Sequence, residues 1–297
     1  MIFKKYFNTK TSKQIYLLIL IACVGVFLGR AWQHIFWDPP YRSLLWDEQL
    51  FKPIITNIFN TSWEHYVTSL YVDHVFQLSF KIIGILFVLG AIIAVFLNKL
   101  GKWSHYYLGI CGIWLLFLAI LYWKEYFWDF PQFAELTAQW SSPLLLLALY
   151  HAHEKNYNIL RLLKIVLSLT FLGHGLYAIG LVPLPGQWVD MMINTFSMSE
   201  SHVKIFLKIV GIGDIIAAIL VWNNHTEKPA FGYMMVWGFI AALGRLIGTY
   251  HIEIGFFEFL HQQAGEFLFR IPQFLLPAAA LLIISIKPKK LKKTVAI

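Results

Sequence analysis

Long apolar segments constrain this chain more than any motif does. Each is close to the roughly 20 residues that a helix needs to cross about 30 Å of hydrocarbon. There are about eight of them: 14–37, 78–98, 103–124, 133–152, 158–182, 204–223, 230–250 and 266–286. Lipid offers no hydrogen-bond partners to a bare backbone, so each segment is predicted to be helical. The predicted fold is all-α, a polytopic membrane bundle of about eight transmembrane helices.

Composition supports burial in lipid over a soluble fold. Of the 297 residues, 58% are hydrophobic and 13% are charged. Ordinary soluble domains have about 45–50% and about 25%. Cys23 and Cys111 fall within apolar runs and form no CxxC, so neither a disulfide framework nor a redox pair is indicated.

The basic residues predict how the chain is oriented. The segments 1–13, 98–104, 151–165, 223–229 and 287–297 hold 15 of the 24 basic residues but only 2 of the 16 acidic ones. Short cytoplasmic loops carry such an excess, so both termini are predicted to be cytoplasmic. Segments 38–77, 125–132, 183–203 and 251–265 then lie outside. The net charge of +8 reflects this orientation and not a nucleic-acid partner. We expect an integral protein of a bacterial inner membrane, with the lipid bilayer as its surroundings.

The first outer segment contains an amphipathic pattern. Within 44–60, Trp46, Leu50, Ile54 and Ile58 recur every four residues, with polar side chains between them. This pattern is typical of a helix that lies in the membrane interface.

The chain also repeats itself weakly. "FLGRAWQHIFWDPP" at 27–40 is similar to "FLGHGLYAIGLVPLP" at 171–185, at an offset of 144. "FKIIGILFVLGAIIAV" at 80–95 is similar to "LKIVGIGDIIAAILVW" at 207–222, at an offset of 127 that pairs Lys81 with Lys208 and Gly84 with Gly211. These matches predict a tandem, parallel duplication of a four-helix unit. The first unit is 1–155, with the long outer segment 38–77, and the second is 156–297, with a basic cytoplasmic tail.

With its glycine in the first helix, its proline-marked outer loop and its "KIxG" second helix, each unit resembles the DoxX-like superfamily. The tandem arrangement also resembles the membrane part of HTTM proteins, which are related to vitamin K-dependent carboxylase. The resemblance implies a compact helical bundle in envelope processes, sometimes beside sulfur or quinone redox enzymes. It carries over no catalytic motif, and the long segment 38–77 departs from the short DoxX-like unit.

Ionisable residues inside predicted membrane segments mark the candidate site. Such residues cost about 2.5–3.5 kcal/mol each on insertion scales and usually face a polar interior or a partner. The ligand-binding candidates are Arg30, His34, His174, Asp214, Arg245, Glu266 and Arg270. All but the midplane Asp214 fall in the outer half. They predict an outward-facing polar pocket, richer in cations than in anions, for a lipid-like or quinone-like molecule. Structural ion pairs and snorkelling side chains are the alternative.

Three classes of function stay open. The first is a binding or accessory subunit of an envelope redox or lipid-handling system, with a quinone or bound lipid as its cofactor and a membrane protein or a second copy as its partner. The second is a membrane enzyme in which His34 or His174 is the catalytic base near an arginine cluster that acts on a lipid-linked substrate. The third is a transporter, which Asp214 favours.

Metal and nucleotide sites receive less support. No Walker loop, GxSxG or HExxH motif is present. Outer histidines and carboxylates at Glu64–His65, His251–Glu253 and Glu258–His261 could assemble a metal site, but their spacing does not decide it, and no metal is predicted.

Overall fold

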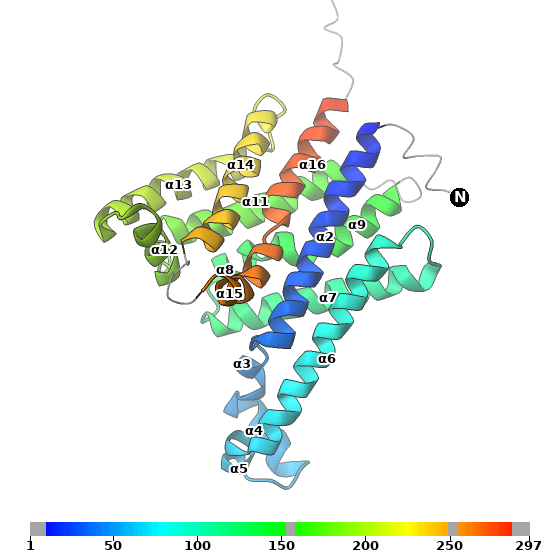
Figure 1. The fold of residues 1–297 in the computed structure, drawn as a ribbon, viewed down its shortest axis with the longest axis vertical. Coiled ribbons are helices and arrows are strands. Elements are labelled where there is room, and N and C mark those ends of the chain that lie inside the picture. Colours follow the sequence, from blue (N-terminus) through cyan, green and yellow to red (C-terminus); the bar gives the residue numbers. More distant parts are fainter. Residues whose placement is uncertain (1–9, 153–157, 249–254, 287–297) are drawn as a thin grey trace, which may run out of the picture.

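The computed structural model describes residues 10–152, 158–248 and 255–286. These residues form helices joined by turns, and they contain no strand (Figure 1). The all-α prediction is therefore confirmed for the described part of the chain.

The helices follow one another in two runs. The first run is α2 (Lys10–Phe36), α3 (Arg42–Leu45), α4 (Glu48–Asn57), α5 (Trp63–Thr68), α6 (Leu70–Val95), α7 (Lys102–Glu125), α8 (Phe130–Glu135) and α9 (Thr137–Tyr150). The second run is α11 (Ile159–Ala178), α12 (Gly186–Phe196), α13 (Glu200–Leu220), α14 (Glu227–Ile247), α15 (Phe256–Leu268) and α16 (Pro272–Ile286).

Six helical stretches of the described chain are long and apolar enough to cross a membrane, which fits an integral membrane protein. They are α2, α6, α7, α11, α14 and the pair α15–α16. Two of the eight expected segments fall outside this group. Helix α9 has only 14 residues, or about 21 Å of helix. Helix α13 has the length but carries Lys204, Lys208 and Asp214. The count of eight therefore stays a prediction.

The first outer segment is partly helical and ends earlier than predicted. Helix α6 already begins at Leu70, because the Ser69 hydroxyl accepts the Val72 N–H and caps it. The amphipathic stretch folds as α4, and Trp46, Leu50, Ile54 and Ile58 are exposed along it. The Lys124 ammonium contacts Asp47, the N-cap of α4, at 2.5 Å, and it lowers the pKa of that carboxyl. This contact ties the start of α4 to the end of α7.

The connecting segments separate onto two sides of the bundle. In Figure 1, α8, α12, α15 and the group α3–α5 lie toward the lower left. The α6–α7 and α13–α14 turns, the start of α2 and the end of α16 lie toward the upper right. Sequence analysis assigns the first group to the outside and the second to the inside. Which side faces the cytoplasm remains a prediction.

Two glycines allow helices to pack so closely that their backbones are in contact. An added Cβ at Gly29 of α2 would lie 2.6 Å from the Phe269 nitrogen, at the junction of α15 and α16. An added Cβ at Gly173 of α11 would lie 2.5 Å from the Glu135 nitrogen, at the junction of α8 and α9. Small residues permit such crossings, which stabilise helix association in lipid.

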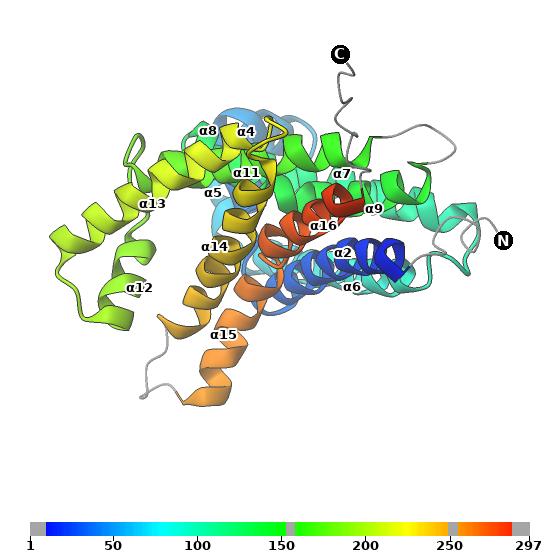
Figure 2. The ribbon, with the colours of Figure 1, turned by 90° about the horizontal axis from the view of Figure 1, so that it is seen from above.

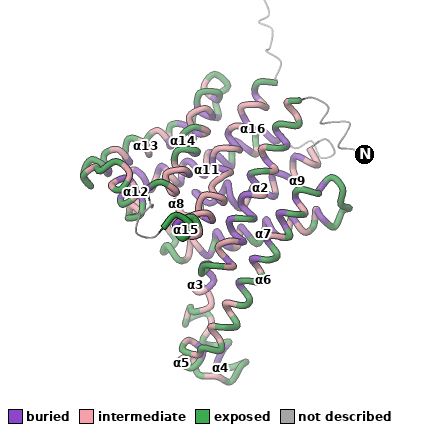
Figure 3. Tube along the Cα trace, in the orientation of Figure 1, coloured by how far each residue is buried: buried purple, intermediate pink, exposed green. Residues whose placement is uncertain are grey.

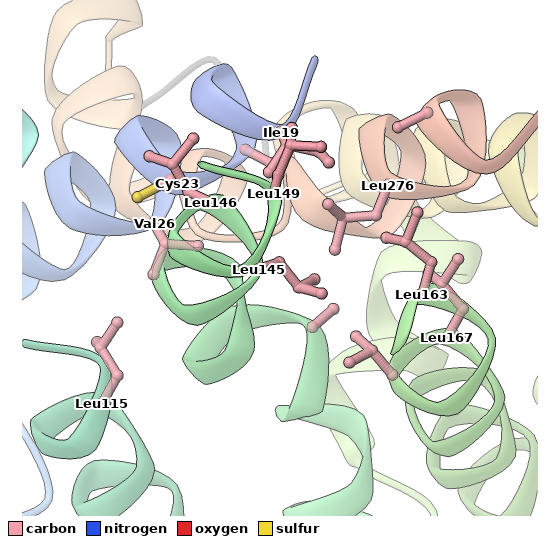
Figure 4. Close-up of a cluster of buried hydrophobic side chains, with 14 of the residues drawn as sticks. Ile19, Cys23, Val26, Leu115, Leu145, Leu146, Leu149, Leu163, Leu167 and Leu276 are labelled. Carbon is pink, nitrogen blue, oxygen red and sulfur yellow. The ribbon is translucent and has the colours of Figure 1, made fainter. Parts of the chain in front are cut away.

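The apolar core lies between these crossings. It joins residues of α2, α7, α9, α11 and α16, among them Ile19, Cys23, Val26, Leu115, Leu145, Leu146, Leu149, Leu163, Leu167 and Leu276 (Figure 4). Viewed from above, α2 and α16 run side by side near the middle, with α12 and α13 at one edge (Figure 2). Buried residues follow this centre, while α4 and α5 are largely exposed (Figure 3). Cys23 and Cys111 are buried free thiols, as their packing role predicts.

The glycine contacts predict a large effect from one methyl group. Gly29→Ala and Gly173→Ala should each lower the free energy of unfolding by about 2–3 kcal/mol, because the methyl group meets backbone atoms that cannot move aside. Gly232→Ala is the matched control, since nothing lies within 4 Å of its added Cβ. Unfolding in mixed detergent micelles measures all three. Equal stability for the three variants would show that α2 and α11 do not pack as described.

The predicted orientation can be tested with exposed cysteines. Gln49→Cys of α4 and Asn224→Cys of the α13–α14 turn both lie at exposed positions, and both native cysteines are buried. A membrane-impermeant maleimide added to intact spheroplasts should modify Gln49→Cys and spare Asn224→Cys until the membrane is opened. The opposite pattern would reverse the orientation and place the candidate site on the cytoplasmic side.

Candidate functional site

A cavity of about 160 Å³ lies between α11, α12, α14 and α16. Its polar lining consists of Glu135, His174, Thr195, Arg245, Arg270 and Gln273. Most of the remaining lining is apolar, including Trp188, Met191, Met192, Phe196, Leu207, Trp237, Ile240 and Ala241. The lining residues Phe196 of α12 and Ile240 and Ile247 of α14 are 62%, 49% and 54% exposed, so we infer that the cavity reaches the surface between these two helices. We call it the inner cavity.

A buried carboxylate orients the histidine of this cavity. The His174 Nδ1 lies 2.7 Å from the Asp214 carboxylate on α13, and Asp214 is fully buried. The Tyr233 hydroxyl of α14 donates to the other Asp214 oxygen at 2.9 Å. The His174 ring also stacks on Trp188 of α12, with 4.4 Å between the ring centroids. These contacts hold the ring at Nδ1, so that Nε2 is the nitrogen left for a ligand or a proton.

The two arginines of the inner cavity have different surroundings. Arg270 pairs with Glu266 at 2.5 Å and approaches Glu135 at 4.0 Å. Arg245 donates to the side-chain amide oxygen of Gln187 at 3.4 Å, and its guanidinium lies 6.0 Å from the Trp188 ring centroid. Because Arg270 is balanced by carboxylates, the cavity has less excess positive charge than predicted.

A second cavity, of about 460 Å³, adjoins the first. It lies between α12, α15, the end of α14 and the end of α2, and we call it the vestibule. Arg245 and Met191 line both cavities, so the two meet there. Its lining is more polar and includes Gln33, Gln187, Asp190, Asn194, Gln262, Gln263 and Glu266, together with Trp37 and Phe269.

The structure brings together most of the predicted residues but not all. His174, Arg245 and Arg270 line the inner cavity, Asp214 lies behind His174, and Glu266 lines the vestibule. Arg30 and His34, which the sequence places in the same pocket, line neither of these two cavities. A ligand-binding role for these two is therefore not supported by cavity contacts.

Arg30 and His34 are instead held inside the bundle. The Arg30 guanidinium donates to the Gln139 oxygen at 2.5 Å and lies 4.3 Å from the Phe269 ring centroid. His34 contacts the Tyr41 hydroxyl at 2.9 Å and its own helix at the Arg30 carbonyl oxygen. Hydrogen bonds within the bundle therefore explain why α2 carries two ionisable residues in an apolar segment.

Sequence reasoning missed the wall that α12 supplies. The sequence analysis places segment 183–203 outside and predicts no helix there, yet Trp188, Met191, Met192 and Thr195 recur at helical spacing and form one side of the inner cavity. That spacing was an available signal. The sequence analysis also does not predict Glu135 as a site residue. This residue lines the cavity because α8 packs against α11 at Gly173.

No metal centre is seen in the part of the chain that the structure describes, where no three histidine, cysteine or acidic residues group suitably. Of the outer residues considered for one, His251 and Glu253 lie outside the described residues. The His261 ring is instead surrounded by Trp32, Phe36 and Trp37.

No protein-family model, curated protein or solved structure matches the chain significantly.

The His174–Asp214 pair predicts strong energetic coupling. His174→Ala should lower the free energy of unfolding by about 3 kcal/mol, because it removes one partner of a buried charged group. Asp214→Ala should have a similar cost, and the double variant should lose less than both single losses together, by about 1–3 kcal/mol. Unfolding in mixed micelles measures the cycle. His202→Ala, at an exposed position of α13, is the control. Additive losses would show that the two residues do not interact.

Proposed function

We propose that this chain is an integral membrane protein whose outer side binds one amphiphilic molecule of lipid-like or quinone-like build. The observation that carries the proposal is the inner cavity, whose lining is largely apolar and includes a few polar groups. Its opening lies among exposed apolar side chains of α12 and α14, where acyl chains would surround it. A polar head at Arg245 and His174 and an apolar tail along Met192 and Trp237 would use both parts of the lining.

Charge balance favours an uncharged or weakly charged head. The inner cavity is lined by Arg245 and Arg270, opposed by Glu135, and Glu266 also pairs with Arg270. A head that accepts hydrogen bonds from Arg245, Gln273 and His174 fits this balance better than a multiply charged anion. Carbonyl and hydroxyl oxygens are such acceptors.

The biological role that we propose is that of a binding or accessory subunit in lipid or quinone handling at a bacterial inner membrane, with both termini cytoplasmic. The lack of nucleotide and hydrolase motifs and the one-sided position of the polar groups support this role over a transporter. The DoxX-like resemblance is kept as part of the proposal and rests on the motifs of α2, α6, α11 and α13.

We also propose that the bundle arose by tandem duplication of a four-helix unit. Helices α2 and α6 pack together as α11 and α13 do, and α7 packs on α9 as α14 does on α16. An added Cβ at Gly84 would meet Ala31, His34 and Ile35, and one at Gly211 would meet Gly175, Ala178 and Ile179, each 144 residues later. The same offset joins the two "FLG" motifs.

The fourth helices support the same pairing. Gly29 approaches Gly265, Leu268 and Phe269, while Gly173 approaches Pro131, Ala134 and Glu135, each 134 residues earlier. "QWSSP" at 139–143 and "QFLLP" at 273–277 follow at that offset. On this pairing Arg30 corresponds to His174 and Gln139 to Gln273. The long Arg30 side chain reaches Gln139 in the first unit, whereas the shorter His174 leaves space beside Gln273 in the second.

An enzyme is the second candidate, and the His174–Asp214–Tyr233 contacts favour it. A carboxylate that holds Nδ1 prepares a neutral imidazole to accept a proton at Nε2. Arg245 beside it would stabilise negative charge that develops on a bound oxygen. The base in this proposal is His174 and not His34, which lies outside both cavities.

Blocking the inner cavity tests the proposed function. Native mass spectrometry of the full chain, purified in detergent from its host membrane, should detect one bound lipid or quinone. Ala241→Trp should abolish that adduct, since Ala241 lines the cavity and the indole would occupy it. The control Ile113→Trp places the same indole at a 64% exposed position of α7, outside both cavities, and should keep the adduct. Wild-type protein without a stoichiometric adduct would contradict the proposal. A His174→Gln adduct of different mass would favour the enzyme.

A further inference from the structure

The vestibule has a lining unlike that of the inner cavity. Five carboxamide side chains line it, namely Gln33, Gln187, Asn194, Gln262 and Gln263, and they come from α2, α12 and α15. Each carboxamide offers a carbonyl acceptor and two N–H donors. A surface of this kind matches a ligand whose groups both donate and accept hydrogen bonds, as hydroxyl groups do.

Three of these amides have no side-chain hydrogen bond to another described residue of the protein. Among the described residues, the structure records no side-chain hydrogen bond for Asn194, Gln262 or Gln263. Gln33 already accepts a hydrogen bond from Arg30, and Gln187 accepts one from Arg245. Three amides on two facing helices are therefore available to a ligand.

The charges of the vestibule oppose a phosphate. Its lining contains one arginine, Arg245, and two carboxylates, Asp190 and Glu266. Glu266 already pairs with Arg270, so a phosphate monoester, with about −1.5 to −2 charges at neutral pH, would face the Asp190 carboxylate and meet only one lining cation, Arg245. An uncharged head avoids this repulsion, and carboxylates accept hydrogen bonds from hydroxyl groups strongly.

Two aromatic rings complete the lining. Trp37 lies at the end of α2 and Phe269 at the α15–α16 junction. Apolar ring surface beside amides and carboxylates suits a molecule with both C–H faces and hydroxyl edges, which is the build of a sugar ring.

We propose that the vestibule binds the uncharged sugar head of a glycolipid whose chains lie in the inner cavity. This inference rests on the proposed function and specifies its ligand. Arg245 and Met191 stand where the two cavities meet, so the linkage between head and chains would pass beside them. The lateral opening between α12 and α14 admits the chains, while the vestibule receives the head.

Lipids with identical chains and different heads test this assignment. The full chain is reconstituted in dioleoyl phosphatidylcholine vesicles that contain equal small amounts of monogalactosyl dioleoylglycerol and dioleoyl phosphatidic acid. It is then extracted in lauryldimethylamine oxide, which is not a glycoside, and its lipid adducts are counted by native mass spectrometry. The galactolipid should be retained about tenfold over phosphatidic acid, which corresponds to about 1.4 kcal/mol.

A double variant separates head recognition from tail binding. Gln262→Leu/Gln263→Leu should bring the retained ratio to that of the vesicle, because galactolipid retention falls while the retained amount of phosphatidic acid stays unchanged. Gln49→Leu, an exposed amide of α4 outside both cavities, is the matched control and should keep the preference. Melting temperatures verify that each variant is folded.

The outcomes distinguish the two proposals. Equal retention of both lipids, or a quinone in place of either, overturns the sugar assignment and leaves the proposed function standing. A galactolipid preference that the double variant retains also overturns it. Retention of no lipid, or retention that Ala241→Trp does not reduce, overturns the proposed function itself.

Discussion

The backbone contacts at Gly29 and Gly173 determine much of this structure. In lipid, apolar side chains gain little by leaving their surroundings, so close packing has to stabilise helix pairs. Each glycine brings a long helix against a junction between two shorter ones, α15–α16 or α8–α9. Those junctions end helices beside the inner cavity, whose lining includes Glu135, Arg270 and His174. A bulkier residue at Gly173 would move α8 and Glu135 together, so the geometry of the candidate site depends on the packing of the bundle.

Polar side chains inside the bundle are mostly held by one another. Arg30 uses Gln139, His34 uses Tyr41, His174 uses Asp214, and Arg270 uses Glu266. Burial without such partners is costly, which explains why each of these buried side chains has a hydrogen-bond partner. A ligand in the inner cavity therefore meets groups that are already oriented, and it need not supply a full counter-charge. In this respect the candidate site differs from a simple anion site, where the ligand supplies the counter-charge of the protein's cations.

The sequence predicted the helical segments well, because apolar length is a local property that needs no knowledge of neighbours. It also singled out His174, Arg245 and Arg270, which line the inner cavity, since an ionisable residue in an apolar run is conspicuous. It failed where contacts between segments distant in sequence determine which side chains lie together. Nothing local shows that Arg30 reaches Gln139 or that Glu135 comes beside Arg270. Helix α12 was missed because an 11-residue amphipathic helix is too short for the window that finds membrane spans, although it supplies one wall of the site.

The lateral position of the opening between α12 and α14 affects how occupancy depends on concentration. On the proposed placement in the membrane, a molecule that enters there would arrive by diffusion within one leaflet, in two dimensions, and not from bulk water. Its binding is then set by its mole fraction among the neighbouring lipids, so adding inert lipid dilutes it even when the volume of the sample is unchanged. Phe196, Ile240 and Ile247, which border the opening, would contact every molecule that exchanges. Saturation would accordingly follow the composition of the membrane rather than its amount.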